Sequence, residues 1–244
     1  MSVERRPPLV SVLMPIHNGE RYVGEALESV RAQTYRNLEV VVVDDGSTDG
    51  SAGIVARFDG LARYAWQPHQ GIGAARNRGV RLARGSLLAF LDADDLMPPH
   101  RIEHQATVVR DRPSVDVVFG EAMEFVTADP GPLPGLRPAS ARSPLRSTGT
   151  MLIRREAFWR VGPFSVTAGG GVELDWRARA VELEIREEML HEVVLERRLH
   201  DGNYGRGRPQ ARRDMLPVLK AALDRRRHVA RSGQAGAGAR GHRP

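Results

Sequence analysis

The sequence of 244 residues contains no cysteine, which excludes disulfide bonds and thiolate metal sites. No apolar run approaches the roughly 18 to 20 residues that a membrane-spanning helix needs. The first residues, MSVERRPP, lack the apolar segment of a signal peptide. These absences predict a cytoplasmic protein, and the length is sufficient for one domain with a sizeable core.

Lysine is nearly absent, since Lys220 is the only one and every other basic residue is arginine. The net charge of +6 is concentrated at the end of the chain. Residues 206–244 hold 11 basic and 2 acidic residues, a net charge of +9, which leaves −3 for the first 205. We expect a basic helix at residues 216–223 followed by a disordered tail. A solvated tail and a tail that binds an anionic membrane surface both fit this composition.

Two hydrophobic periods alternate over the first hundred residues, and they predict alternating strands and helices. The predicted strands are residues 9–14, 38–43, 63–66 and 86–91. The predicted helices are residues 20–33, a helix capped by Ser47, and residues 72–83. Such repeated strand–helix units are typical of a parallel sheet covered by helices.

The second half of the chain has a less regular pattern. It predicts helices at residues 99–110, 155–161 and 173–181, and strands at residues 115–119 and 150–153. Residues 130–144 are rich in Pro, Gly and Ser, which favours a loop.

Polar clusters follow three of the predicted strands: Pro15-Ile16-His17-Asn18, Asp44-Asp45-Gly46-Ser47 and Asp92-Ala93-Asp94-Asp95. The carboxyl ends of parallel strands form the ligand-binding edge of an open sheet, so these clusters should converge. Several carboxylates at one edge repel one another unless cations or hydrogen bonds compensate them. Oxygen ligands of this kind suit Mg²⁺ or Mn²⁺ with phosphate oxygens. The alternative interpretation is that the acids are helix caps and turn formers.

Two stretches carry a resemblance to a known family. VSVLMPIHNGERYVGEALESVRAQTYRNLEVVVVDDGSTDGS and HQGIGAARNRGVRLARGSLLAFLDADDLMPP resemble the donor-binding half of family 2 glycosyltransferases. The resemblance implies the GT-A fold, an α/β, Rossmann-like and mostly parallel sheet flanked by helices. It also implies a GT-A domain at residues 1–205, with a nucleotide-sugar half at 8–110 and a smaller acceptor and catalytic-base half at 111–205. Residues 206–244 would form the basic helix and tail.

The resemblance implies a metal-dependent, inverting transfer of one sugar from a nucleotide-diphosphate sugar, with UDP as the expected carrier. The acceptor is a hydroxyl on a glycan, a lipid-linked molecule or a small molecule, as in cell-surface glycan biosynthesis. The processive Q-x-x-R-W motif is absent, because Gln210 is followed by Ala-Arg-Arg-Asp. This absence favours single transfer. The basic tail would then contact the inner face of an anionic membrane, and no nucleic-acid partner is expected.

The family pattern also assigns roles to residues of the donor site. Asp45 would accept a hydrogen bond from a uracil imide N–H, and Pro15 and His17 would pack on the base, with His17 in place of the usual Tyr. Arg76 would lie near the base and phosphates. In the acidic cluster, Asp94 would bind Mn²⁺ or Mg²⁺, Asp92 the ribose or donor sugar, and Asp95 the sugar or the metal's waters. His200, in the late R-x-H element, is a metal-ligand candidate, although a plain loop histidine fits equally.

The catalytic base would lie in the segment Gly169-Gly170-Gly171-Val172-Glu173-Leu174-Asp175, which resembles the family's G-x-E-D-x-D. Glu173 takes the place of the family's catalytic Asp, and Asp175 is the fallback. Both acids also suit the first turn of a helix, whose dipole favours negative charge. The family's E-D pair reads Val172-Glu173 here. The Val172 substitution leaves a second hypothesis open, namely a catalytically inactive nucleotide-sugar-binding or scaffold protein. A nucleotidyltransferase is disfavoured because no Gly-rich loop follows the first strand, and an RNA-binding module because the body is acidic and aromatic residues make up only 5%.

Overall fold

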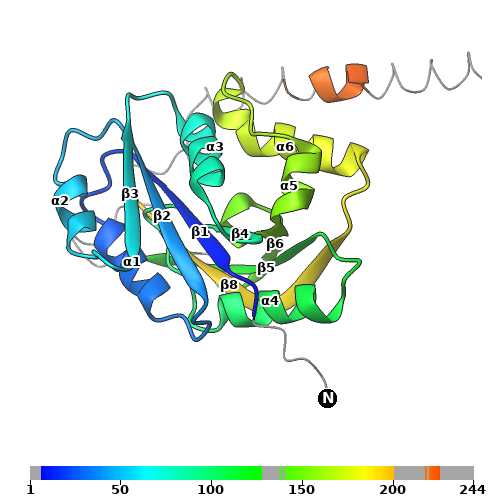
Figure 1. The fold of residues 1–244 in the computed structure, drawn as a ribbon. Coiled ribbons are helices and arrows are strands. Elements are labelled where there is room, and N and C mark those ends of the chain that lie inside the picture. The colour runs from blue at the N-terminus through cyan, green and yellow to red at the C-terminus, as the bar shows by residue number, and fades with distance from the viewer. Residues whose placement is uncertain (1–6, 128–137, 139–140, 201–217, 219, 226–244) are drawn as a thin grey trace, which may run out of the picture.

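The computed structural model describes residues 7–127, 138, 141–200, 218 and 220–225. Its strands form one eight-stranded sheet in the order β3-β2-β1-β4-β7-β5-β6, with β8 paired to β5 (Figure 1). The strands are β1 (Val10–Ile16), β2 (Leu38–Asp45), β3 (Ala62–Gln67), β4 (Leu87–Phe90), β5 (Val117–Val126), β6 (Ser143–Leu145), β7 (Leu152–Arg154) and β8 (Glu187–Leu199). The helices are α1 (Val23–Arg31), α2 (Ser51–Ala56), α3 (Ile72–Leu82), α4 (Arg101–Asp111), α5 (Arg155–Val161) and α6 (Val172–Glu182), with short 3₁₀ turns η1 (Thr148–Thr150) and η2 (Gly169–Gly171).

The first four strands are parallel, as the alternating pattern predicted. β1 lies between β2 and β4, and β2 pairs with β3. The β1–β2 register runs to the pair Ile16 and Asp44, so the two strands end together. The residues that follow β1 and β2 therefore lie at one edge of the sheet.

The second half makes the sheet mixed. β7 runs antiparallel to both β4 and β5, and β6 runs antiparallel to β5, whereas β8 is parallel to β5. The predicted α/β, mostly parallel architecture is confirmed, and β8 is an element that the sequence pattern did not predict. Its sequence EEMLHEVVLERRL mixes charged and apolar residues, and only four of its thirteen residues are buried.

Helices cover both faces of the sheet (Figure 1). Because successive strand residues point to opposite faces, neighbouring residues of β1 contribute to different cores. Val12 packs with residues of α1, α2 and α4. Leu13 packs with residues of α3, α5 and α6, including the fully buried Trp176. The sheet is therefore the middle layer, and its carboxyl edge is left to polar residues.

Two local predictions are corrected by the structure. Ser47 does not cap a helix, because α2 begins at Ser51 with Gly50 at the N-cap. The backbone N–H of Ser47 donates instead to Asp44 Oδ1 over 2.7 Å, which forms a turn. The predicted loop at 130–144 is wrong at its end, since Ser143 and Pro144 belong to β6. The earlier part of that loop lies largely outside the described residues.

The tail prediction is only partly covered by the structure. Val218 and residues 220–225 are helical, in line with the basic helix expected at 216–223. The other residues of 206–244, with the expected disordered tail, lie outside the described part. Within the described part, no helix has the length and apolar character to cross a membrane.

Candidate active site

Two histidines, one after β1 and one after β3, lie against the backbone of Asp45 at the end of β2. The Nδ1 atoms of His17 and His69 lie 2.9 and 3.0 Å from the carbonyl oxygen of Asp45. A carbonyl accepts only, so these contacts require the proton on Nδ1. The two rings lie 4.2 Å apart between centroids with a tilt of 34°. His17 is exposed, while Pro15 is buried within β1.

The carboxylate of Asp45 is buried and surrounded by donors. Its Oδ1 accepts hydrogen bonds from the Gln67 side chain at 2.6 Å and the Gln70 backbone at 2.9 Å. Its Oδ2 accepts from the Gly71 backbone at 2.7 Å and lies 2.9 Å from Nδ1 of His69. These four donors fill the usual capacity of a carboxylate. Of the side chains involved, that of His69 is 60% exposed, so it is the partner that a ligand can reach.

Arg76 joins two of the predicted site residues. This guanidinium, on α3, is only 4% exposed. Its Nη2 lies 2.8 Å from Asp92 Oδ1, and its Nη1 lies 3.2 Å from Glu173 Oε1. Burial acts to lower the pKa of Arg76, but Asp92 and Glu173 outweigh it and raise the pKa above its ordinary value. Arg76 is therefore a fixed cation between the acidic turn after β4 and the start of α6.

The neighbouring Asn77 fastens α3 to the segment before α6. Its Nδ2 donates to the Phe164 carbonyl over 2.9 Å, and the Phe164 N–H donates to its Oδ1 over 2.8 Å. Gly73, one helical turn earlier, faces the same segment, and a Cβ there would meet the carbonyl oxygen of Ser165. Asn77 and Gly73 therefore hold α3 close to the segment that leads into α6.

We predict that Gly73→Ala lowers the free energy of unfolding by about 1–3 kcal/mol, because overpacking against backbone forces atoms apart. The matched control is Gly53→Ala in α2, where an added Cβ meets nothing within 4 Å. Alanine should there stabilise the helix by roughly 0.5–1 kcal/mol. Urea denaturation of both variants measures the difference. Equal free energies of unfolding for the two variants would contradict the close packing of Gly73 against the Ser165 carbonyl.

The acidic cluster Asp92-Ala93-Asp94-Asp95 forms a turn, and Arg198 of β8 is hydrogen-bonded to it. The N–H of Asp95 donates to the Asp92 carbonyl over 3.1 Å. Arg198 donates its backbone N–H to Asp95 Oδ1 at 2.9 Å and its Nε to the Asp94 carbonyl at 2.8 Å. Arg198 is 1% exposed and pairs with Glu25 at 2.7 Å. Arg198 therefore fixes the turn to α1 and β8.

Burial raises the pKa of Asp95 to about 8, with further contributions from the charges of Asp94 and Asp92. A carboxylate whose pKa is raised by neighbouring negative charge binds a proton or a cation more readily. A cation at this turn would favour the ionised forms. The negative charge of the three carboxylates at this turn would therefore suit a bound cation.

Asp94 and His200 are the pair best placed to hold a metal ion. Oδ2 of Asp94 lies 2.9 Å from Nε2 of His200, whose ring stands 5.0 Å from that of Tyr22. Among the described residues, no group of three or more His, Cys, Asp or Glu side chains is arranged to hold a metal. A carboxylate and an imidazole fit Mn²⁺ or Mg²⁺ only where waters and substrate phosphates complete the shell, as these ions commonly accept.

Glu173 and Asp175 have different surroundings although both lie in the first turn of α6. Glu173 accepts a hydrogen bond from the Thr148 hydroxyl and contacts Arg76. Asp175 accepts from Arg179 Nε at 3.0 Å and lies 3.7 Å from Arg225 Nη1. Asp175 is thus committed to ion pairs within the second half, whereas Glu173 shares Arg76 with the acidic turn.

The structure thus groups the predicted residues in three places: His17 with Asp45, Arg76 with Asp92 and Glu173, and Asp94 with His200. Sequence reasoning missed His69, Thr148 and Arg198 as members of the site. His69 follows β3, so the rule applied to the other strand ends would have found it. Arg198 lies in the late R-x-H element. Thr148 lies in a 3₁₀ turn with no sequence signal.

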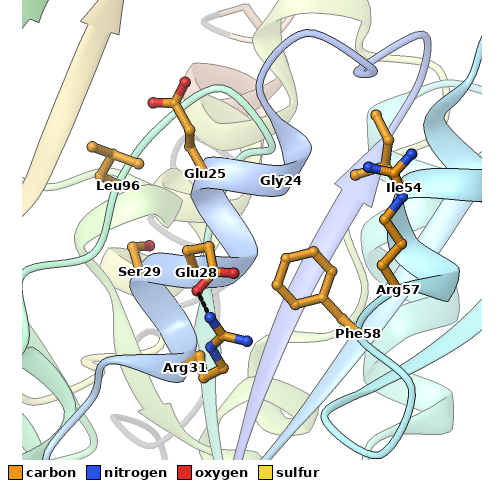
Figure 2. Close-up of a pocket in the computed structure, with 9 residues that line it drawn as sticks. All are labelled: Gly24, Glu25, Glu28, Ser29, Arg31, Ile54, Arg57, Phe58 and Leu96. Atoms are coloured by element: carbon orange, nitrogen blue, oxygen red, sulfur yellow. Dashed lines mark ion pairs between the residues drawn. The ribbon is translucent and has the colours of Figure 1, made fainter.

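A pocket of about 530 Å³ lies away from this chemistry, between α1 and α2 (Figure 2). Phe58 and Ile54 form its apolar side, and Glu25, Glu28 and Arg31 lie across from them. Glu25 pairs with Arg198, so the pocket touches the support of the acidic turn. None of the predicted site residues lines it.

Comparison with known proteins gives three kinds of match. Residues 11–162 match the model of the family described as "Glycosyl transferase family 2". An uncharacterized glycosyltransferase of Rickettsia typhi is 30% identical over 212 residues, which cover 80% of this chain and 65% of the relative. Glycosyltransferase GlyG of Streptococcus pneumoniae is 36% identical over 125 residues, 50% of this chain and 41% of GlyG. The chain spans less than two thirds of the length of these relatives.

Solved structures give the fold. Staphylococcus aureus TarS in complex with UDP-GlcNAc has a TM-score of 0.72 at 20% identity, covering 87% of this chain and 65% of that one. The Pyrobaculum calidifontis mannosyltransferase PcManGT, in complex with GDP-Man and Mn²⁺, has a TM-score of 0.65 at 21% identity, covering 97% and 77%. The expected GT-A fold is confirmed.

Proposed function

Because the chain belongs to glycosyltransferase family 2, we propose that it moves a single sugar from a nucleotide-diphosphate sugar to an acceptor hydroxyl, with inversion and with a divalent metal ion. The observation that carries the proposal is Arg76, which lies between Asp92 and Glu173. One buried cation thereby joins a donor-side acid to a candidate base. The two solved structures with donors bound, one with UDP-GlcNAc and one with GDP-Man, support a nucleotide-sugar as substrate.

On the donor side, the base would lie against His17 and His69. The exposed His69 shares Asp45 Oδ2 with the Gly71 N–H, so a nucleobase N–H would reach Asp45 by displacing His69. An imide N–H, as in uracil, is a donor that a carboxylate can accept. UDP is therefore the proposed carrier, with Pro15 supporting the strand end from within β1. Asp92 would bind the ribose or the donor sugar, and Arg76 would face the developing diphosphate charge.

Asp94 and His200 would hold Mn²⁺ or Mg²⁺, with Asp95 orienting the metal's waters or the sugar. When bound, the ion would stabilise negative charge on the leaving diphosphate. The 2.9 Å contact between Asp94 and His200 supports this assignment. Arg198 contacts the turn at the Asp95 carboxylate and the Asp94 carbonyl, so the Asp94 carboxylate would remain for the metal.

The transfer itself needs a base opposite the leaving group. Glu173 would take the proton from the acceptor hydroxyl as its oxygen attacks the anomeric carbon. The bond from that carbon to the diphosphate oxygen breaks with the electron pair leaving on the diphosphate. Residues 8–110 would thus bind the donor, and residues 111–205 would provide the base and the acceptor surface.

A donor screen tests the proposal. Purified protein would be incubated with UDP-glucose, UDP-GlcNAc, UDP-galactose and GDP-mannose, each with Mn²⁺ and with EDTA. We expect Mn²⁺-dependent release of nucleoside diphosphate from one donor, with water as the acceptor, and micromolar to millimolar binding of the matching diphosphate. Binding without release from any donor would favour the inactive, scaffold-type alternative. If the protein bound no donor or diphosphate and released no nucleoside diphosphate, the proposal would be refuted.

We further propose that the basic tail places the enzyme at the inner face of an anionic membrane, beside a lipid-linked acceptor. Residues 226–244 contain five arginines and no acidic residue. Each basic residue near an anionic surface contributes about 1 kcal/mol. A chain ending at Arg225 keeps the contacts of Arg225 with Glu182 and Asp175, so it is a suitable truncation.

We predict that the full chain floats with vesicles of phosphatidylglycerol and phosphatidylcholine, and that the chain ending at Arg225 binds at least about tenfold more weakly. Neutral vesicles and 0.5 M salt are the controls, because screening removes an electrostatic attraction. Equal flotation of both chains would show that the tail does not drive membrane contact.

A further inference from the structure

The carboxylate of Glu173 is held through one of its oxygens. Oε1 accepts the hydrogen bond from the Thr148 hydroxyl and lies 3.2 Å from Arg76 Nη1. Across the part of the chain that the structure describes, both of these closest contacts are made by Oε1, and Oε2 accepts no hydrogen bond. The side chain is 36% exposed. The carboxylate therefore presents one occupied and one open oxygen.

Thr148 itself is fixed by its surroundings. It is 4% exposed and begins the η1 turn, which a reciprocal pair of hydrogen bonds between Ser147 and Thr150 closes. Thr150 is fully buried, its hydroxyl donates to the Leu145 carbonyl over 2.5 Å, and its carbonyl accepts from Gln105 Nε2 at 2.8 Å. The Thr148 hydroxyl is thus a donor on a rigid support.

Arg76 alone cannot set the direction of this carboxylate. Its guanidinium is shared, since Nη2 lies 2.8 Å from Asp92 Oδ1 while Nη1 faces Glu173. A glutamate has one more side-chain torsion than an aspartate, and that freedom has an entropic cost when the group is ordered. A second donor at Oε1 removes the freedom, because two donors at one oxygen define the plane of the carboxylate.

We propose that Thr148 is a positioning residue for the transfer reaction, which holds Glu173 Oε1 so that Oε2 takes the proton of the acceptor. The inference rests on the proposed function. Thr148 touches neither donor nor acceptor in this role, and it acts through Glu173. This contact would also allow a glutamate to serve as the base in place of an aspartate, because Thr148 holds the longer side chain at Oε1. Oε2 would then face the acceptor.

The test compares the wild type with Thr148→Val, Thr148→Ser and the control Thr34→Val. Thr34, which follows α1, donates a similar but exposed hydrogen bond to Glu103 Oε2 of α4 over 2.6 Å. The readouts are kcat and KM for the most active donor of the screen, with Mn²⁺ and water as acceptor, and the affinity for UDP or GDP by calorimetry. Thr148→Val should lower kcat about 10- to 100-fold, since small misplacements of a reacting group have effects of this order.

KM and the diphosphate affinity of Thr148→Val should stay within about twofold of the wild type. Thr148→Ser keeps the hydroxyl and should recover most of kcat, and Thr34→Val should match the wild type. A Thr148→Val kcat within twofold of the wild type, or a Thr148→Ser kcat as low as that of the valine variant, would overturn the inference. Should the valine variant fail to bind diphosphate, the serine variant decides. A wild type without binding or release would instead refute the proposed function, and this inference with it.

Discussion

Replacing Asp94 with alanine should reduce release of nucleoside diphosphate by about 10³-fold or more. Asp94 is the carboxylate that faces His200 at 2.9 Å, and it is the proposed metal ligand. Stabilisation of charge on a leaving group commonly contributes several kcal/mol, and about 4 kcal/mol corresponds to a 10³-fold change in rate. The loss should therefore exceed that of any residue that only contacts the donor.

The variant also makes a binding prediction. Mn²⁺ should raise the affinity of the wild type for UDP or GDP, and Asp94→Ala should remove that increase, as measured by calorimetry with and without the metal. Asp111→Ala is the matched control, because Asp111 is an exposed acid paired with Arg110 at 2.8 Å far from the turn. Normal turnover by Asp94→Ala would contradict both the metal assignment and the role of the acidic turn.

The donor half was predictable because its signals are local. The runs at 38–43 and 86–91 are apolar on both faces, which is the mark of interior parallel strands, and both became strands with buried side chains. The acids that follow them could then be placed at one edge by a topological rule alone. Arg76 and Asp92 meet there, with Nη2 and Oδ1 2.8 Å apart.

The second half was less predictable because its contacts span long distances in sequence. β8 has an irregular pattern, since its burial depends on pairing with β5 across two register shifts. Thr148 and Glu173 are 25 residues apart and meet only because the fold brings η1 to the start of α6. Neither the period of the hydrophobic residues nor the residue types of the turns predicts which of these distant segments come into contact.

The identity of the base was left open by the sequence, and the surroundings of the two candidates now separate them. Asp175 lies 2.9 Å from Arg179 Nη2 within α6 and 3.7 Å from Arg225 Nη1 in the C-terminal helix. Removing its charge should therefore loosen the link between these two helices. We expect Asp175→Asn to lower the melting temperature while the remaining folded enzyme keeps its kcat. Among the described residues, the ion-pair and hydrogen-bond partners of Glu173 are Arg76 and Thr148.

Glu173→Gln should lower kcat about 10²- to 10⁴-fold, the usual contribution of a general base. Glutamine keeps the size of the side chain and an oxygen for the Thr148 hydroxyl, but it cannot take a proton. UDP or GDP affinity should stay within about twofold, because the base does not contact the leaving group. Glu156→Gln, an exposed first-turn acid of α5, is the matched control and should match the wild type.

The comparison of Glu173→Gln with Asp175→Asn decides the assignment, since both remove one charge from the same helical turn. A base and a structural ion pair predict opposite results: lost kcat with normal stability for Glu173, and normal kcat with lost stability for Asp175. If Glu173→Gln kept its kcat while Asp175→Asn lost it, the base would be Asp175. In that case the pairing of Arg76 with Glu173 would serve to hold α6 against the acidic turn.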